Sequence, residues 1–475
     1  MAGIKSYGAY IPYYRMPRSV ISAAWGRGGG RGELAIAGYD EDPVSMSVSA
    51  GIDCLNGTDP KVIDAVYLAT TTPPYLERLS SNIVSNALDL RRDARNVDFG
   101  NSLRAGVSAL MAAVDAVNAG SLKSVLVTAS DLRLGAPGGE HEQALGDGAA
   151  ALLVENDAVA VEIEGSLTYS DDLADYWRKD GDVFIRSWED RFGRDAGYSQ
   201  IPVEVAKGLM AKLNLTPQDI SKACIAGANA RAQTSLARSI GFTPEQIQDA
   251  LLDDVGNTGV AQPLMILIAA LEDAKPGDRV MMVTWGTGCD AVVLKVTDQI
   301  DKIKDRRAIK RHLAIKGTLD NYGKYMRWRD LVPTQVRSRG GISMSAEWRE
   351  RKLGLALYGV KCLNCGTIQL YMRGSSMRAH VCIECQAKDN FEPYRFADKT
   401  GKVVTFSHDY LGGGINPPMT RAVIDFEGGG RGLFDMVDRD PEECKVGMSV
   451  EMTFRKTITA ETSNSYFWKI KPVRE

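Results

Sequence analysis

Apolar and polar positions alternate in blocks along the first 297 residues of the chain. Continuous apolar runs, such as Val125–Val127 and Val280–Val283, are typical of strands that are buried on both faces. Between these runs, helical periodicity predicts helices over residues 103–119, 201–213 and 261–273. Strands and helices in alternation predict an α/β domain, in which helices pack on a sheet. The predicted strands are Ala65–Thr70, Asn96–Phe99, Ser124–Ala129, Ala149–Val154, Lys222–Gly227, Arg279–Trp285 and Ala291–Val296.

The pattern changes after about residue 358, where short apolar stretches alternate with turns rich in Gly, Pro and Asp. Little of this region has helical periodicity. Several short strands separated by such turns predict a small β-barrel. The predicted strands are Val403–Leu411, Thr420–Phe426, Gly432–Val437, Met448–Phe454 and Tyr466–Val473.

The segment between these regions, residues 301–352, is basic and contains interleaved aromatic residues. Such a segment could contact nucleic acid or the phosphates of a nucleotide-like cofactor. The alternative is a solvated arm that packs on the first domain, and the sequence leaves both open. The basic residues are Arg306, Arg307, Lys310, Arg311, Arg337, Arg339, Arg349, Arg351 and Lys352, and the aromatic residues are Tyr322, Tyr325, Trp328 and Trp348.

Length, charge and hydropathy restrict the class of protein. The chain has 475 residues, too many for one ordinary core, so we expect about two or three domains. Its net charge of −3 gives no global basic excess that would argue for nucleic acid. Residues 1–11 have the pattern of a first strand, not of a secretion signal, and no apolar run approaches the ~18 residues of a membrane span. We therefore expect no membrane association and a cytoplasmic location.

Four of the eight cysteines form two close pairs. Cys362 and Cys365 enclose two residues, as do Cys382 and Cys385, and sixteen residues separate the pairs. Each pair brings two sulfurs together, and two such pairs complete a tetrahedron of thiolates around zinc. Because four thiolates leave no open position on the metal, the predicted zinc site is structural. Without a secretion signal, this spacing favours metal binding over disulfides.

Several motifs of the first 335 residues are similar to those of archaeal-type 3-hydroxy-3-methylglutaryl-CoA synthases. They are Ile4–Arg15, Ala37–Asp42, Gly256–Thr258 and Trp285–Asp290. The resemblance implies a thiolase-type fold, with two similar halves in a five-layered α/β/α/β/α arrangement. It also implies CoA or acyl-CoA as a ligand and a homodimeric state.

The remainder of the chain, from about Ser343, resembles zinc-ribbon/OB-fold proteins associated with acyl-CoA enzymes. The similar stretches are Ala346–Glu350, Tyr358–Cys362, Asp438–Glu443 and Val446–Met448. This resemblance implies a thiolase-type protein partner and makes nucleic acid an unexpected ligand. With both resemblances, the expected domains are 1–298, synthase-like; 299–345, a basic linker or arm; 346–395, a zinc ribbon with a leading helix; and 396–475, an OB-fold barrel.

Condensing enzymes of this fold use a thiol nucleophile, an imidazole and an amide donor, and the synthases add a carboxylate acid or base. Matching Ala105-Gly106 to the synthase nucleophile motif places Leu103 at the cysteine, whereas a slip of one residue places Ser102 there. The second motif places Ala226 at the histidine, and the acid corresponds to Thr71. Only Asn257, in Gly-Asn-Thr, matches its role in the family.

These matches support two main hypotheses. In the first, the chain is a synthase-like subunit that binds acyl-CoA, lacks the usual Cys and His, and acts with a thiolase-type partner in making or breaking C–C bonds. In the alternative, it is a self-sufficient acyltransferase or condensing enzyme whose reorganised site uses Ser102, His141 or Cys289. A third hypothesis is nucleic-acid binding by the ribbon, barrel and basic segment. Against it, the barrel strands lack the dense Arg and Lys combined with stacking aromatics that single-strand binding favours.

Overall fold

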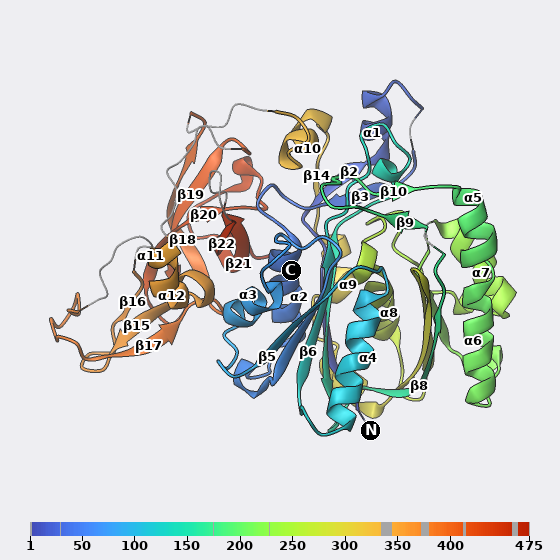
Figure 1. Ribbon diagram of the computed structural model, residues 1–475. Coiled ribbons are helices and arrows are strands. Elements are labelled where there is room, and N and C mark those ends of the chain that lie inside the picture. The colour runs from blue at the N-terminus through green and yellow to red at the C-terminus, as the bar shows by residue number, and fades with distance from the viewer. Residues whose placement is uncertain are drawn as a thin grey trace. The chain divides into compact units, whose positions relative to one another are not determined.

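The computed structural model of the protein describes residues 2–28, 30–173, 175–227, 229–333, 344–371, 380–411, 415–457 and 464–474. The chain forms two compact units, drawn in Figure 1. The N-terminal unit comprises Met1–Ala37, Asp42–Ser85 and Leu90–Tyr322. The C-terminal unit comprises Gly38–Glu41, Asn86–Asp89 and Gly323–Glu475. In the described part of the chain, no helix is both long enough and apolar enough to cross a bilayer.

The N-terminal unit is built on a nine-stranded sheet with the order β11-β12-β13-β8-β1-β7-β6-β4-β5. Its two halves have the same topology. Counted outward from the centre of the sheet, each half begins with its first strand in the chain, continues with its last strand and then with its next-to-last strand. The halves meet where β1 pairs antiparallel with β8, at Gly3↔Glu162 and Ile4↔Val161. The strands are β1 (Gly3–Tyr10), β4 (Ala65–Ala69), β5 (Arg95–Phe99), β6 (Val125–Asp131), β7 (Gly148–Glu155), β8 (Val161–Ser170), β11 (Lys222–Ile225), β12 (Arg279–Trp285) and β13 (Gly288–Val296).

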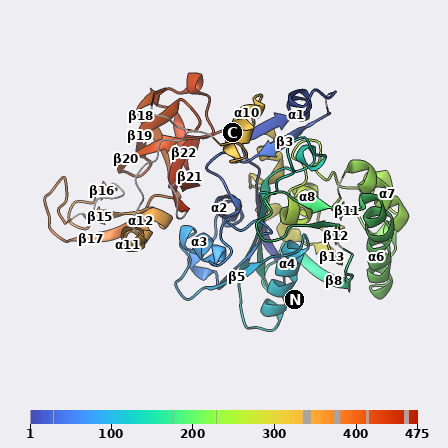
Figure 2. The same ribbon diagram turned by 45° about the horizontal axis from the view of Figure 1, so that its top comes forward.

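Helices lie between the two half-sheets and on their outer faces, as Figures 1 and 2 show. The helices α4 (Ala105–Asn118) and α8 (Gln262–Asp273) form the central layer, and every residue of α8 from Gln262 to Leu271 is buried. A helix that is apolar on all sides requires such a position between two sheets. The outer layers contain α2 (Pro43–Cys54) on one side and α6 (Ile201–Lys212) and α7 (Ala230–Ile240) on the other. The predicted five-layered α/β arrangement is therefore confirmed.

Strand β8 is the element of the sheet that the sequence pattern did not predict. Its residues, Val161–Ser170, alternate Glu, Ser and Thr with apolar side chains, and most of them are only partly buried. The strand is nevertheless central, because β13 pairs with it over its whole length. Between β8 and α6 the chain forms two short strands, β9 (Tyr176–Trp177) and β10 (Arg186–Ser187), which pair with each other.

The basic segment after β13 begins as part of the N-terminal unit. It forms a 3₁₀ helix, Asp298–Ile303, and α9 (Ala308–Ala314). The backbone N–H groups of Arg307 and Ala308 both donate to the carboxylate of Asp53 at 2.9 Å. Arg337 and Arg339, which belong to the predicted basic linker, lie outside the described residues.

The C-terminal unit contains a small sheet and a closed barrel. The sheet has the order β16-β15-β17, with β15 (Tyr358–Cys362), β16 (Ile368–Gln369) and β17 (Phe391–Arg395). The barrel, with the order β18-β19-β20-β22-β21, confirms the predicted small barrel. Its strands are β18 (Thr400–Asp409), β19 (Met419–Phe426), β20 (Arg431–Met436), β21 (Ser449–Thr457) and β22 (Ser465–Pro472).

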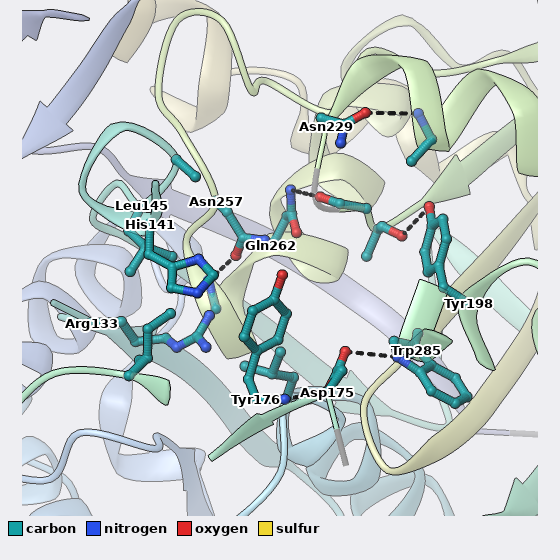
Figure 3. A pocket seen from close by; sticks show the side chains of 18 of the residues that line it. Arg133, His141, Leu145, Asp175, Tyr176, Tyr198, Asn229, Asn257, Gln262 and Trp285 are labelled. Carbon is teal, nitrogen blue, oxygen red and sulfur yellow. Dashed lines mark hydrogen bonds between the residues drawn. The ribbon is translucent and has the colours of Figure 1, made fainter. Parts of the chain in front are cut away.

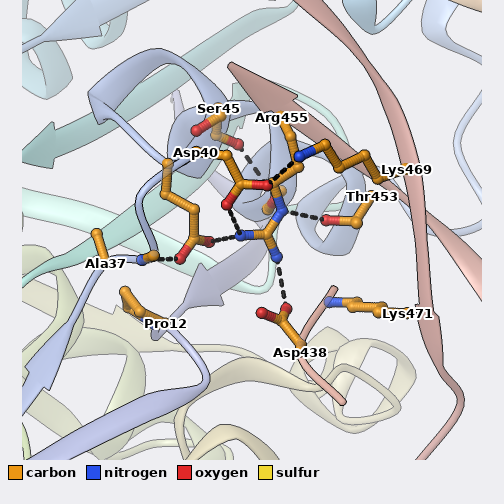
Figure 4. Close-up of polar contacts among 12 residues, drawn as sticks. Pro12, Ala37, Asp40, Ser45, Asp438, Thr453, Arg455, Lys469 and Lys471 are labelled. Carbon is orange, nitrogen blue, oxygen red and sulfur yellow. Dashed lines mark hydrogen bonds and ion pairs between the residues drawn. The ribbon is translucent and has the colours of Figure 1, made fainter. Parts of the chain in front are cut away.

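A cluster of buried charges lies at strands β21 and β22 of the C-terminal unit (Figure 4). Arg455 of β21 forms ion pairs with Glu41 and Asp438, and all three side chains are buried. Lys469 of β22 pairs with Asp40 at 2.6 Å. Burial alone would raise the pKa of Asp40, but the charges of Lys469 and Arg455 outweigh it and hold that pKa below its ordinary value.

Candidate functional site

A cavity of about 340 Å³ opens in the N-terminal unit beside the carboxyl ends of β11 and β12 and the turn that follows β5 (Figure 3). Ligands of open α/β sheets bind outside the carboxyl ends of the strands. Further walls come from the start of α8, from the loop that contains His141, and from the segment between β8 and α6.

The turn between β5 and α4 presents Leu103 to the cavity. The turn is tight, because Asn101 has a φ of 66°. The guanidinium of Arg104 is held by Asp290 at 2.8 Å and by the carbonyl of Gly286 at 2.9 Å. The Ser102 hydroxyl donates to the same Gly286 carbonyl at 2.9 Å, and Ser102 is not among the described residues that line the cavity. The side chain at the tip of this turn is therefore a hydrocarbon.

Ala226 and Asn257 line the same cavity as Leu103. Ala226 directly follows β11, and its carbonyl accepts a hydrogen bond from the Tyr198 hydroxyl at 3.0 Å. The Asn257 side-chain oxygen accepts from the N–H of Gly259 at 2.9 Å. Among the described residues, no acceptor takes the Asn257 amide N–H groups, so both are directed to an acceptor outside this set. The structure thus brings together three of the positions matched from the sequence.

Thr71 lies apart from these three and is not among the described lining residues. Its N–H and hydroxyl donate to the carboxylate of Asp131 at 2.6 and 2.9 Å. The hydroxyls of Thr70 and Thr72 donate to the same carboxylate at 3.1 and 3.2 Å, as does the Val260 N–H at 3.0 Å. Asp131 is therefore a fully buried carboxylate whose oxygens are already satisfied.

His141 lines the cavity at the start of a short 3₁₀ helix, His141–Gln143. Its Nε2 lies 2.9 Å from the hydroxyl oxygen of Ser187, and its ring meets that of Tyr176 edge-on at 5.3 Å. Ser187 itself is not among the described lining residues.

Three further residues of the cavity escaped the sequence analysis: Arg133, Asp175 and Tyr176. Arg133 follows β6, and its guanidinium lies over the Tyr176 ring at 5.6 Å. Asp175 accepts hydrogen bonds from the Trp285 indole and from the Tyr176 N–H, both at 2.8 Å. Burial raises the pKa of Asp175 above its ordinary value. Arg133 and Asp175 lie in loops and Tyr176 in the two-residue strand β9, where no periodic pattern marks them.

The scattered cysteines of the N-terminal unit do not reach the cavity. Cys224 and Cys289 are buried, and neither is among the described residues that line it. Burial raises the pKa of both thiols. A thiol that stays protonated is a poor nucleophile.

The four paired cysteines of the C-terminal unit form one cluster, with all ligand atoms within 4.8 Å of one another. The Sγ atoms of Cys362 and Cys385 are 3.6 Å apart, and those of Cys365 and Cys382 are 3.5 Å apart. A tetrahedron with Zn–S bonds of ~2.3 Å has sulfurs about 3.8 Å apart, so the donor set fits zinc. Gly366, with a φ of 77°, permits the turn after the first pair.

Two sequence families match parts of the chain. Residues 210–296 match the C-terminal part of 3-oxoacyl-[acyl-carrier-protein] synthase III. Residues 394–455 match the C-terminal OB-fold domain of ChsH2.

Solved structures of two enzymes resemble the chain. An HMG-CoA synthase complexed with CoA aligns with a TM-score of 0.64 at 18% identity, over 72% of this chain and 94% of that one. The 3-oxoacyl-[acyl-carrier-protein] synthase III of Aquifex aeolicus aligns with a TM-score of 0.54 at 21% identity, over 62% of this chain and 100% of that one. These similarities confirm the predicted thiolase-type fold.

Curated relatives are closer in sequence. The hydroxymethylglutaryl-CoA synthase of Caldivirga maquilingensis is 34% identical over 343 residues, 70% of this chain and 98% of the relative. That of Methanopyrus kandleri is 31% identical over 335 residues, 68% of this chain and 95% of the relative. This extent of identity, over nearly the whole length of the relatives, shows that the chain belongs to the hydroxymethylglutaryl-CoA synthase family, with an OB-fold domain at its C-terminal end.

Proposed function

We propose that this protein is an acyl-CoA-binding member of its family that lacks the usual nucleophile and imidazole, and that it acts with a thiolase-type partner in forming or cleaving C–C bonds. The observation that carries the proposal is that Leu103 and Ala226 face one cavity together with Asn257. Leucine and alanine can neither accept an acyl group nor transfer a proton. On this proposal, the chain keeps the binding of a synthase and not its chemistry.

Within this cavity, the Asn257 amide is suited to hold a thioester. Its N–H bonds can donate to the thioester carbonyl oxygen, because the amide oxygen is already held by Gly259. The hydrocarbon of Leu103 excludes water from the same region. The residues thus orient the acyl group, and the chemical step takes place on the partner.

The C-terminal unit supplies the second part of the proposal. Its match to a ChsH2 OB-fold domain supports a role in assembly with an acyl-CoA enzyme, which we take to be a thiolase-type protein. Cys362, Cys365, Cys382 and Cys385 would hold a structural zinc ion, since their sulfurs occupy all four tetrahedral positions. A homodimeric state and a cytoplasmic location stay predictions.

The proposal is tested by incubating the purified chain with acetyl-CoA. We expect calorimetry to detect binding and intact-mass spectrometry to find no acetyl adduct on the protein. A double variant, Leu103→Cys with Ala226→His, restores the two missing groups and serves as the matched comparison. This variant should acquire an adduct, because a thiol and an imidazole then face the cavity.

Two results would contradict the proposal. One is a covalent acyl adduct on the unmodified chain together with turnover in the absence of any partner. The other is a failure of acetyl-CoA to bind at all. Condensation or thiolysis that requires both the chain and a thiolase-type protein would support it.

A self-sufficient enzyme with a reorganised site is the second candidate, and the pair His141 and Ser187 favours it. The 2.9 Å contact between His141 Nε2 and the Ser187 hydroxyl has the geometry of a base beside a nucleophile. This candidate predicts an acyl adduct that survives in Ser102→Ala and disappears in Ser187→Ala. Peptide mapping of the adduct decides between the two serines.

A further inference from the structure

Glu142 is a buried carboxylate that lies next to the cavity without being among the described residues that line it. It is 2% exposed and belongs to the short 3₁₀ helix His141–Gln143. Its Oε2 accepts from the Gly138 N–H at 2.8 Å and from the Trp25 indole at 3.2 Å, and its Oε1 accepts from the Tyr322 hydroxyl at 2.5 Å. Burial of a carboxylate is costly unless hydrogen bonds satisfy it, so these three donors fix its position.

The loop after this carboxylate holds the backbone of Asn257. The Asn257 N–H donates to the Ala144 carbonyl at 2.8 Å, and the Asn257 carbonyl accepts from the Gly146 N–H at 3.1 Å. Leu145 forms a parallel bridge with Asn257, and the two residues lie next to each other in Figure 3. A Cβ added at Gly146 would lie 1.8 Å from the Val255 carbonyl oxygen, so the loop packs directly on the segment that leads to Asn257. The position of Asn257 therefore follows that of the loop.

Tyr322 lies where the chain leaves the N-terminal unit. It is the last residue of that unit and the first residue of α10 (Tyr322–Trp328), and the chain continues from it into the C-terminal unit. Its ring meets that of Trp25 edge-on at 5.9 Å, and the Trp25 indole also donates to its hydroxyl oxygen at 3.2 Å. Within the N-terminal unit, a series of contacts thus runs from Tyr322 through Glu142 and its loop to Asn257.

We propose that Glu142 is a positioning residue for Asn257, and that Tyr322, at the exit to the C-terminal unit, controls it. The inference rests on the proposed binding of acyl-CoA and adds a means of regulation to that site. While the Tyr322 hydroxyl is bonded to Glu142, the loop stays in place and the Asn257 amide meets the thioester carbonyl. When this bond is broken, the loop shifts and the amide loses its alignment with the carbonyl. A change in the segment that enters the C-terminal unit thereby alters how the acyl group is held.

The test measures the hydrogen bond to the thioester in the full chain. Acetyl-CoA labelled at its thioester carbonyl is bound to each variant, and isotope-edited infrared spectra report the carbonyl stretch. Hydrogen bonds polarise the carbonyl and lower its frequency, so Asn257→Ala should raise the band and define its unbonded value. We expect Tyr322→Phe, which loses only a hydroxyl, and Glu142→Gln, which loses the charge, to move the band at least halfway to that value. A residue that contributes only to stability would leave the band in place.

Tyr410→Phe is the matched control, because Tyr410 is 69% exposed and belongs to the C-terminal unit. Its band should coincide with that of the unmodified chain. An unmoved band in both Tyr322→Phe and Glu142→Gln would overturn the inference and leave the proposed acyl-CoA binding intact. An unmoved band in Asn257→Ala would also overturn it, because Asn257 would then make no bond that needs positioning. If acetyl-CoA does not bind the unmodified chain, the proposed function itself fails, and hydrogen exchange of the loop alone decides the inference.

Amide hydrogen exchange gives this readout without CoA. The N–H groups of Asn257 and Gly146 are bonded between the loop and its neighbouring segment and should exchange slowly in the unmodified chain. In Tyr322→Phe they should exchange about 10–100-fold faster, the factor for one hydrogen bond to a charged group. Arg18 still holds a backbone carbonyl of the loop at 2.7 Å, so this variant loosens the loop without unfolding it. Equal exchange in Tyr322→Phe and Tyr410→Phe would overturn the inference.

Discussion

Leu103 and Ala226 present hydrocarbon to the cavity at the positions where the motif match predicts reactive groups, whereas Asn257 presents an amide. An amide orients a carbonyl without being consumed, so this set of residues suits binding. Arg133 adds a fixed positive charge to the same cavity. On the proposed function, these four side chains bind a ligand and do not react with it.

Glu272 permits a test of pH dependence at the residue scale. Burial raises its pKa from 4.5 to about 7, and the neighbouring charge of Asp273 adds to the shift. Because the pKa is higher in the folded state, the stability that the protonated carboxyl provides is complete below about pH 4.5. It is lost as the pH rises through about 7.

Glu272→Gln should therefore be more stable than the unmodified chain at pH 8, with little difference at pH 4.5. We expect a gain on the order of 1 kcal/mol, because solvent screening reduces the effect at this partly exposed group. Urea denaturation at both pH values measures it. Glu204→Gln, at an exposed site on α6, is the control, and an equal gain at both pH values would contradict the assignment.

At the scale of elements, two turns hold the groups of interest in place. The β5–α4 turn is tied to the β12–β13 hairpin through Arg104, Gly286 and Asp290. Each cysteine pair lies on a turn that is closed by one backbone hydrogen bond. The Gly366 N–H donates to the Cys362 carbonyl at 2.9 Å, and the Gln386 N–H donates to the Cys382 carbonyl at 3.0 Å. The β5–α4 turn therefore depends on a partner that is distant in the chain, whereas each cysteine turn is closed by a bond that spans four residues.

Arg104→Gln tests the first turn. Removal of the Arg104 guanidinium leaves Asp290, which is almost fully buried, without its counterion. We expect a loss of about 3 kcal/mol in the free energy of unfolding. The amides of residues 101–105 should exchange hydrogen faster because the turn is released. Arg91→Gln, which removes an arginine that is more exposed and pairs with Asp64, should change stability by less than about 1 kcal/mol. Similar losses in both variants would contradict this reading.

Cys365→Ser tests the second turn and the metal. The unmodified chain should contain zinc in a 1:1 ratio, measured by elemental analysis, and the variant should not retain it. Loss of zinc should open the β15–β17 sheet to proteolysis, because the metal joins segments that have little core of their own. Cys444→Ser, outside the cluster, should keep its zinc. A zinc-free chain with an intact, protease-resistant sheet would contradict the prediction.

At the scale of the whole molecule, the C-terminal unit contains two segments from the first 90 residues, Gly38–Glu41 and Asn86–Asp89. These segments supply the acids Asp40 and Glu41 to Lys469 and Arg455, and Asp89 to Lys352. A fragment that begins after Tyr322 would lack all three acids. Basic side chains of the C-terminal unit therefore pair with acids from the first 90 residues of the chain.

Arg455→Met should lower the stability of the barrel by about 3–5 kcal/mol, because Glu41 and Asp438 stay buried without their cation. Native-state hydrogen exchange of the amides in β21 and β22 measures this loss locally. Arg421→Met removes an exposed pair with Asp435 in the same barrel and should cost less than about 1 kcal/mol. Equal protection of β21 and β22 in the two variants would disprove the role of the cluster.

The sequence by itself determined the elements whose pattern is local. The strands of both halves other than β8, the helices α4, α6 and α8, and the strands of the barrel lie where their periodicity predicts them. The four cysteines of the predicted zinc site also follow from their short spacing. Burial of one or both faces of an element imposes a period on the apolar residues along it, and this period can be recognised in the sequence without the structure.

Only the tertiary structure decided which residues meet. Strand β8 escaped prediction because its partly exposed face mixes polar and apolar side chains, although its pairing with β1 and β13 joins the sheet. Arg133 and Asp175 come from separate loops and acquire a role only because the chain closes over one cavity. Whether a buried charge has a partner depends on contacts distant in sequence, and such contacts leave no periodic trace in the chain.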